Sequence, residues 1–273
     1  MATKRSYPPS PASDPRRLRC VPRITAARVR PSRTGRARAK LCCVHFTLED
    51  VEAALRARGL APRGAFHPEP PDAVAPLSDG RAVATLVLAG NVGGGLWQRF
   101  ERERSAGPDP LDRWSARVLR QIADSFGAGV LLAADPRHPF QRWAQRAEPV
   151  HRSPLGILIH PDHGLWHAYR GALAFAEPLA LPGRARRPSP CDACAERPCL
   201  RACPVGAFSA HGFDDAACAA HVSSPAGVDC LERGCLARRA CPVGRGVRYP
   251  DAQQRFHMEA SLAARRLRGK STA

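Results

Sequence analysis

The sequence of 273 residues has no apolar run that approaches the length of about 20 residues needed for a transmembrane helix. It also has no apolar stretch that could form the core of a secretory signal peptide. These two absences predict a soluble, cytoplasmic protein without membrane association. In a reducing compartment the eleven cysteines are expected to be thiols or metal ligands rather than disulfides.

Acidic residues are scarce, because 24 Asp and Glu face 42 Lys and Arg, which gives a formal net charge of +18. Much of this imbalance lies in residues 1–43, which hold twelve Lys or Arg and one acidic residue, Asp14. The segment is rich in proline and has little apolar periodicity, so we expect a basic disordered arm. Because so much of the charge lies in this arm, a zinc-stabilised nucleic-acid binder is the weakest function considered, and no nucleic-acid partner is expected.

What the chain does have is a cysteine-rich segment, with eight of its eleven cysteines between residues 191 and 241. The first run has the spacing C-x2-C-x4-C-x3-C-P and the second has C-x11-C-x4-C-x5-C-P. Bacterial ferredoxins with two [4Fe–4S] clusters also end their cysteine runs in Cys-Pro. The pattern predicts two [4Fe–4S] clusters, and the expected ligands are Cys191, Cys194, Cys199, Cys203, Cys218, Cys230, Cys235 and Cys241.

In the dicluster pattern the last cysteine of each run binds the cluster of the other run. We therefore expect Cys241 to join the first three cysteines of the first run. Cys203 is expected to join Cys218, Cys230 and Cys235. Structural zinc stays open as an alternative, because two all-cysteine zinc sites would use the same number of thiolates.

Residues 44–182 have the patterns of an α+β domain. Thr47 to Asp50 is typical of a capping box that opens a helix, and Ala82–Ala89 is typical of a buried strand. Asp109-Pro110 predicts a second helix start, with Asp109 as its N-cap. Further along we expect a strand at 130–132, a helix at 140–146, and a hairpin whose strands 155–160 and 165–176 flank a turn at 161–164.

The remaining segments follow from composition. Residues 183–190, rich in Arg and Pro, predict a linker. Residues 191–250 then form the dicluster ferredoxin-type module, and residues 251–273 form a C-terminal helix or tail.

The segment from Ser153 to Ala176 resembles the core of the cobalamin-trafficking proteins of the methylmalonic aciduria and homocystinuria type C family. The strand at 84–88 and the helix start at 109–112 extend the resemblance over about residues 47–182. It implies a flavin-reductase-like fold and a corrinoid or flavin site. The matching positions, and hence the implied cofactor-binding residues, are His160, Gly164, Trp166 and Arg170.

Each of these side chains also has a purely structural interpretation. Trp166 could pack in the core of a hairpin, because alternate residues of a strand face the interior. Arg170 could pair with a carboxylate, and His160, which precedes a proline, could be a turn residue.

The cysteine module resembles the epoxyqueuosine reductases, in which a related corrinoid-binding domain precedes a dicluster ferredoxin domain. The resemblance is carried by Ala202–Phe208, after the first cysteine run, and by Phe213–Cys218, which leads to the isolated cysteine. The cysteine spacings are wider here, and we find no counterpart of the acidic catalytic residue of that family.

Two classes of function follow. In the first, the chain is a ferredoxin-type electron-transfer protein that works with a redox partner protein. In the second, it is an oxidoreductase whose N-terminal domain holds a corrinoid or flavin that the two clusters supply with electrons. The second predicts that the hairpin at 155–176 lines a cavity near one cysteine group, with Arg170 or His160 in it.

Overall fold

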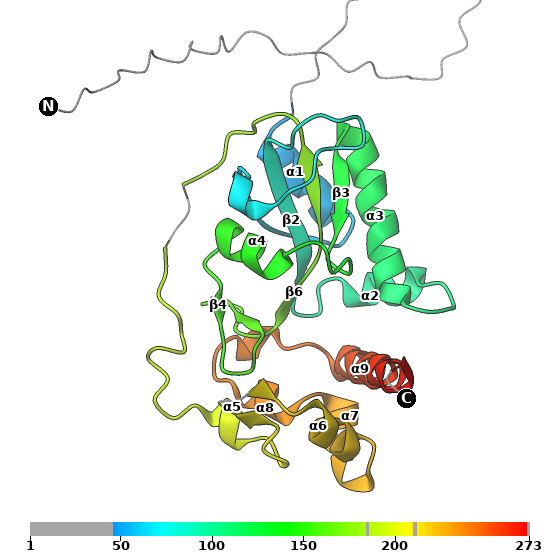
Figure 1. Ribbon diagram of the computed structural model, residues 1–273, viewed down its shortest axis with the longest axis vertical. Helices are drawn as coiled ribbons and strands as arrows, with labels where there is room; N and C mark the ends of the chain where they lie inside the picture. The colour runs from blue at the N-terminus through cyan, green and yellow to red at the C-terminus, as the bar shows by residue number, and fades with distance from the viewer. Residues whose placement is uncertain (1–45, 184–185, 210–211, 272–273) are drawn as a thin grey trace, which may run out of the picture. The chain divides into compact units, whose positions relative to one another are not determined.

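The computed structural model describes residues 46–183, 186–209 and 212–271, with side chains as far as residue 265. The segment expected to be a basic arm, residues 1–43, lies outside the described residues. Thr47–Ala273 form one compact unit, in which the cysteine module follows an α+β region (Figure 1).

A four-stranded antiparallel sheet forms the centre of the α+β region, with the strand order β1-β2-β6-β3. Strand β6 pairs with β2 on one side and with β3 on the other. The mixture of helices and small antiparallel sheets confirms the predicted α+β class. The strands are β1 (Ala61–Phe66), β2 (Thr85–Val92), β3 (Gly129–Leu132) and β6 (His167–Phe175), and the helices of this region are α1 (Leu48–Ala57), α2 (Trp97–Glu103), α3 (Pro110–Phe126), α4 (Phe140–Ala147) and the 3-10 turn η1 (Pro70–Asp72).

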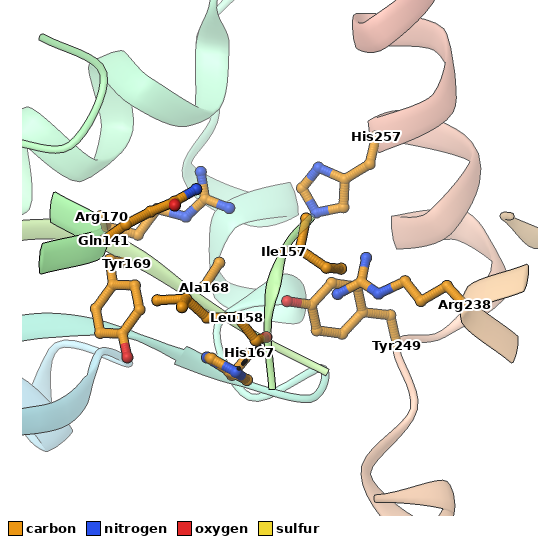
Figure 2. Close-up of a pocket in the computed structure, with 10 residues that line it drawn as sticks. All are labelled: Gln141, Ile157, Leu158, His167, Ala168, Tyr169, Arg170, Arg238, Tyr249 and His257. Atoms are coloured by element: carbon orange, nitrogen blue, oxygen red, sulfur yellow. Dashed lines mark hydrogen bonds between the residues drawn. The ribbon is translucent and has the colours of Figure 1, made fainter. Parts of the chain in front are cut away.

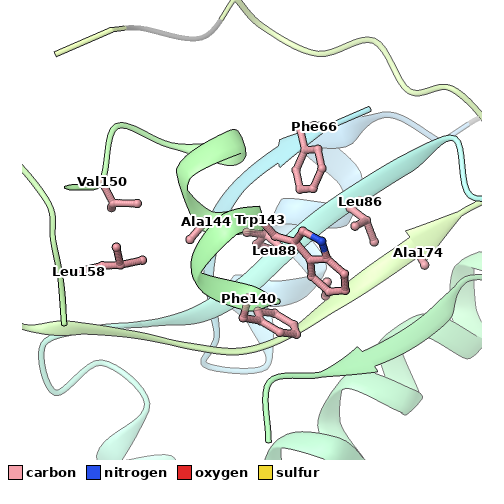
Figure 3. Close-up of a cluster of buried hydrophobic side chains, with 10 residues drawn as sticks. Phe66, Leu86, Leu88, Phe140, Trp143, Ala144, Val150, Leu158 and Ala174 are labelled. Carbon is pink, nitrogen blue, oxygen red and sulfur yellow. The ribbon is translucent and has the colours of Figure 1, made fainter. Parts of the chain in front are cut away.

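Helices cover both faces of the sheet, which explains why β2 and β6 are apolar along most of their length. On one face, Trp143 of α4 packs against Leu86 and Leu88 of β2, as Figure 3 shows. On the other face α3 lies so close that a side chain at Gly171 of β6 would be 2.5 Å from Leu119 Cδ1. The glycine therefore leaves room for the Leu119 side chain of this helix.

Two predicted helix starts differ in their capping. At α1 the capping box is present, with the Asp50 backbone N–H donating to Thr47 Oγ1 and the Thr47 backbone N–H donating to Asp50 Oδ2 at 2.8 Å. At α3 the position is correct, but Asp109 has a φ of 44° and its side chain makes no capping hydrogen bond. An N-cap residue typically has extended backbone, which Asp109 does not, and the predicted capping interaction is wrong.

The predicted strand pair at 155–176 is also wrong as a continuous hairpin. Only Leu158–Ile159 (β5) is a strand in its first half, and it pairs with His151–Arg152 (β4). A single bridge, His160 to Gly164, connects the two sides of the turn. Strand β6 instead finds its partners in β2 and β3, because those strands offer it a long ladder within the main sheet.

The cysteine module consists of short helices connected by tight turns. Helix α9 follows the module. The sequence predicted a helix or a tail for this segment, and the structure shows a helix. None of the described helices is long and apolar enough to cross a membrane. The elements are α5 (Pro198–Arg201), β7 (Phe208–Ser209), β8 (Gly212–Phe213), α6 (Asp215–Val222), η2 (Pro225–Gly227), α7 (Val228–Arg233), α8 (Leu236–Ala240), η3 (Arg245–Val247) and α9 (Asp251–Ser271).

Backbone and aromatic contacts attach the module and helix α9 to the α+β region. At the turn before β6, a Cβ on Gly164 would lie 2.1 Å from the carbonyl oxygen of Val243, so the two backbones are in direct contact. Helix α9 contributes Phe256, whose ring lies 5.4 Å from Trp97 and 5.5 Å from Phe100 of α2. Backbone packing and aromatic packing thus both hold the module against the α+β region.

The backbone contact leads to a stability prediction. Gly164→Ala should cost about 1–2 kcal/mol for its positive φ of 57° and about 1–3 kcal/mol more for the contact with Val243. Gly156→Ala is a matched control, because Gly156 has a φ of 76° but open space around its Cβ position. Urea unfolding of both variants measures the difference, and equal costs would contradict the close contact.

Candidate metal centres and the adjoining cavity

Cys191, Cys199 and Cys241 pack in one hydrophobic cluster, which also contains Leu155, Ile159 and Leu165 of the α+β region. Burial raises the pKa of Cys191, and the charges of Cys241, Cys199 and Cys194 raise it further. Burial likewise raises the pKa of Cys241, to which Cys194 adds. Cys241 therefore lies within electrostatic reach of the first run, although about 40 residues separate it from Cys199 in the sequence.

The fourth cysteine of the first run faces the second group. Cys203 lines one small cavity together with Cys218, Cys230 and Cys235. Apolar side chains, among them Phe208 and Met258, line the same cavity. The two groups adjoin, because Cys203 and Cys235 also pack in the hydrophobic cluster that contains Cys191, Cys199 and Cys241. The fold thus brings together the residues of the crossed dicluster pattern, and cluster binding by them stays a prediction.

Several N–H groups point at the sulfur atoms. The Ala207 backbone N–H donates to Cys203 Sγ at 3.3 Å, and Arg265 Nη1 of α9 donates to Cys218 Sγ at 3.7 Å. The backbone N–H of Val243 lowers the pKa of Cys241, opposing the larger effect of burial. Donors of this kind stabilise negative charge on sulfur, which fits thiolates that bind iron.

All eight thiols are free in the structure. Within the described part of the chain, no three His, Cys, Asp or Glu side chains are placed so that they could hold a single metal ion. Four cysteine thiolates are the ligand set that a [4Fe–4S] cluster requires, and N–H groups near sulfur tune its potential.

A larger cavity of about 290 Å³ lies where the α+β region meets the module (Figure 2). Strands β5 and β6 form one wall of it, and α8, Tyr249 and α9 form the other. Two arginines and two histidines from three elements line it: Arg170 and His167 of β6, Arg238 of α8 and His257 of α9. The cavity predicted beside the segment 155–176 is therefore present, with Arg170 in its wall.

Arg238 connects this cavity to the thiols. Its backbone N–H lowers the pKa of Cys235, a thiol whose pKa is raised chiefly by burial. Its guanidinium lies 4.6 Å from the ring centres of both Trp166 and Tyr249 and donates from Nε to the Leu165 carbonyl oxygen at 3.1 Å. One residue thus contacts a candidate metal ligand with its backbone and the cavity with its side chain.

The other predicted cofactor-binding residues lie behind this wall and do not line the cavity. Trp166 is fully buried and supports Arg238 and Tyr249 with its ring. Gly164 makes the backbone contact with Val243. His160 is 7% exposed, and its Nδ1 accepts hydrogen bonds from the backbone N–H groups of Asp162 and His163 at 3.0 and 3.3 Å.

A buried polar network, which the sequence did not indicate, lies beside the cavity. Glu148 Oε1 accepts hydrogen bonds from Arg63 Nε at 2.9 Å and from the Tyr169 hydroxyl at 2.6 Å. Arg63 is 1% exposed and also donates to His167 Nδ1 at 3.1 Å. Burial and the charge of Arg63 lower the pKa of His167 to about 2, so this ring is neutral. The network fixes Tyr169 and His167, which both line the cavity.

No family model and no curated protein matches the sequence. Among solved structures, an epoxyqueuosine reductase with a tRNA-Tyr epoxyqueuosine-modified tRNA stem loop is 12% identical, with a TM-score of 0.44. The epoxyqueuosine reductase from Streptococcus thermophilus is also 12% identical, with a TM-score of 0.42. Each similarity covers 74% of this chain, and 66% and 67% respectively of those chains, so this chain spans about two thirds of the length of the epoxyqueuosine reductases that it is similar to.

Proposed function

We propose that the protein is an iron–sulfur electron-transfer protein of the ferredoxin type with two [4Fe–4S] clusters. Cys241 would hold one cluster together with the first three cysteines of the first run. Cys203 would hold the other together with the first three cysteines of the second run. The observation that carries the proposal is the position of Cys203, which shares a cavity with Cys218, Cys230 and Cys235. A redox partner protein in the cytoplasm would exchange electrons with it.

When bound, a [4Fe–4S] cluster supplies one-electron transfer at a potential set by hydrogen bonds to sulfur and by solvent exposure. The chain provides hydrogen bonds to sulfur and limits solvent exposure. Apolar side chains such as Phe208 and Met258 keep water from the second group, and Arg265 and Ala207 donate hydrogen bonds to its sulfurs. Near the first group, the charges of Arg245 and Arg248 favour the thiolate of Cys241.

A second candidate is a reductase that binds part of a corrinoid or flavin in the cavity of about 290 Å³. The observation that favours it is Arg238, which contacts both the cavity and the Cys235 thiol. Neither candidate includes reduction of a tRNA nucleoside. The resemblance to that family would call for an acidic catalytic residue, and no Asp or Glu is among the described residues that line the cavity.

Redox titration of the anaerobically purified protein tests the first candidate. We expect dithionite to bleach the visible absorbance and an oxidised dye to recover about two electrons per chain, one for each cluster. A preparation that accepts no electrons would contradict it. Titration with cobalamin and with flavin then tests the second candidate, which requires binding at micromolar concentration and its loss in Arg170→Ala.

A further inference from the structure

The cavity between β6, α8 and α9 gathers positive charge from separate segments of the chain. Figure 2 shows the guanidinium of Arg170, the guanidinium of Arg238 and the ring of His257 turned toward a common space. Among the described residues that line this space, none is Asp or Glu. Asp112 is the carboxylate that pairs with Arg170, at 3.6 Å, and its own side chain is 48% exposed. The cavity therefore has positive charge that its walls do not neutralise.

Two polar atoms of these side chains have no hydrogen-bond partner. Arg170 Nε and His257 Nε2 are both buried without one, and the Arg170 side chain is only 13% exposed. A buried donor left without a partner costs about 1–3 kcal/mol, so such atoms in a cavity call for an explanation. A ligand that accepts hydrogen bonds and carries negative charge would satisfy both atoms, with His257 donating from the tautomer that carries its proton on Nε2.

Burial, together with the charges of Arg170 and Arg238, lowers the pKa of His257. Burial lowers the pKa of His257 to about 3, with these two guanidinium groups adding to the effect. Burial also lowers the pKa of Arg170. An anion between them would offset this cost, since an opposite charge within a few ångströms favours the protonated form of both groups.

Apolar side chains form another part of the cavity wall. Ile157, Leu158 and Ala168 line it, and Ile157 is 40% exposed at its opening. Its volume of about 290 Å³ is just below the usual range for small-molecule sites, which begins at about 300 Å³. This shape suits an organic group of modest size with a charged end.

We propose that this cavity binds an organic ligand through a carboxylate or phosphate group, which accepts hydrogen bonds from Arg170 and His257 while Arg238 adds charge. The apolar body of the ligand lies against Ile157 and Ala168. The inference deepens and rests on the second candidate function, because it names the ligand chemistry of the same cavity. The oxyanion could belong to a free small acid or to the phosphate of a flavin nucleotide.

Calorimetry on the full chain, purified anaerobically, tests the proposal at constant ionic strength with two pairs of probes. Benzoate and benzamide have the same shape and differ in charge, and flavin mononucleotide differs from riboflavin by its phosphate. In at least one pair we expect the charged member to bind about ten-fold or more tightly than the neutral one. Preference in the first pair identifies a free acid, and preference in the second identifies a flavin phosphate. Equal binding or no binding in both pairs overturns the proposal.

Variants locate the effect. Arg170→Gln should abolish the preference for the charged probe, whereas Arg56→Gln, which removes an exposed guanidinium of α1, should leave it unchanged. Asp112→Asn removes the competing carboxylate and should strengthen binding several-fold, which covers the case in which Arg170→Gln does not fold. A preference that survives Arg170→Gln, or that Asp112→Asn does not increase, contradicts the proposal. Dithionite reduction of the same samples reports on electron transfer separately, so the two proposals can fail independently.

Discussion

Cys203→Ala is expected to remove the cluster that the second cysteine run holds and to leave the cluster of its own run in place. The reason is spatial: Cys203 lines the cavity of Cys218, Cys230 and Cys235, whereas Cys241 lies with Cys191. Because each cube contains four irons, the iron content should fall from about eight to about four per chain.

Double variants identify which cluster is lost. Cys203→Ala combined with Cys218→Ala should still keep about four irons, because both residues serve the same cluster. Cys203→Ala combined with Cys191→Ala should leave almost none, because the two residues serve different clusters. Iron analysis, together with electron paramagnetic resonance of reduced samples, measures how many clusters each double variant keeps. If the double variant at Cys203 and Cys191 keeps half of the iron, these two residues serve the same cluster and the crossed assignment is wrong.

Glu148→Ala should cost about 3–5 kcal/mol in the free energy of unfolding, because it leaves a buried charge unpaired. Arg63 is 1% exposed and pairs with this carboxylate at 2.8 Å. The Tyr169 hydroxyl would lose its acceptor as well. Urea unfolding under anaerobic conditions, with the iron content matched to that of the unsubstituted protein, measures the loss.

Two controls separate charge burial from ordinary ion pairing. Glu52→Ala breaks a pair with Arg56, whose side chain is 61% exposed, and should cost less than about 1 kcal/mol. Arg63→Met combined with Glu148→Leu removes both buried charges and should recover much of the stability lost in Glu148→Ala. If Glu148→Ala costs no more than Glu52→Ala, the network does not contribute as described.

The parts of the fold that the sequence predicted well depend on local signals. The capping box at Thr47 places α1, and the apolar stripe after Asp109-Pro110 places α3. The predicted strand 82–89 was shifted relative to β2, which continues through an irregularity at Gly90 to Val92. That shift depends on the partner β6, which no local pattern encodes.

The residues of the candidate site also differ in how far the sequence predicts them. The spacing of the cysteines predicted that Cys203 joins Cys218, Cys230 and Cys235, and these four residues line one cavity, while their binding of a cluster stays a prediction. Arg238 and His257 were missed, since they reach the cavity from α8 and α9, elements that the sequence gives no reason to place beside β6. Arg170 was singled out by resemblance and does line the cavity, whereas Trp166, singled out in the same way, lies behind it.

The most direct test of the central claim is the metal and sulfide content of the full chain, purified without oxygen and characterised by Mössbauer spectroscopy. Two [4Fe–4S] clusters predict about eight irons and about eight acid-labile sulfides per chain, with the spectrum of cubane iron. About two zinc ions per chain without sulfide would contradict the account, because the eight cysteines would then form two zinc sites.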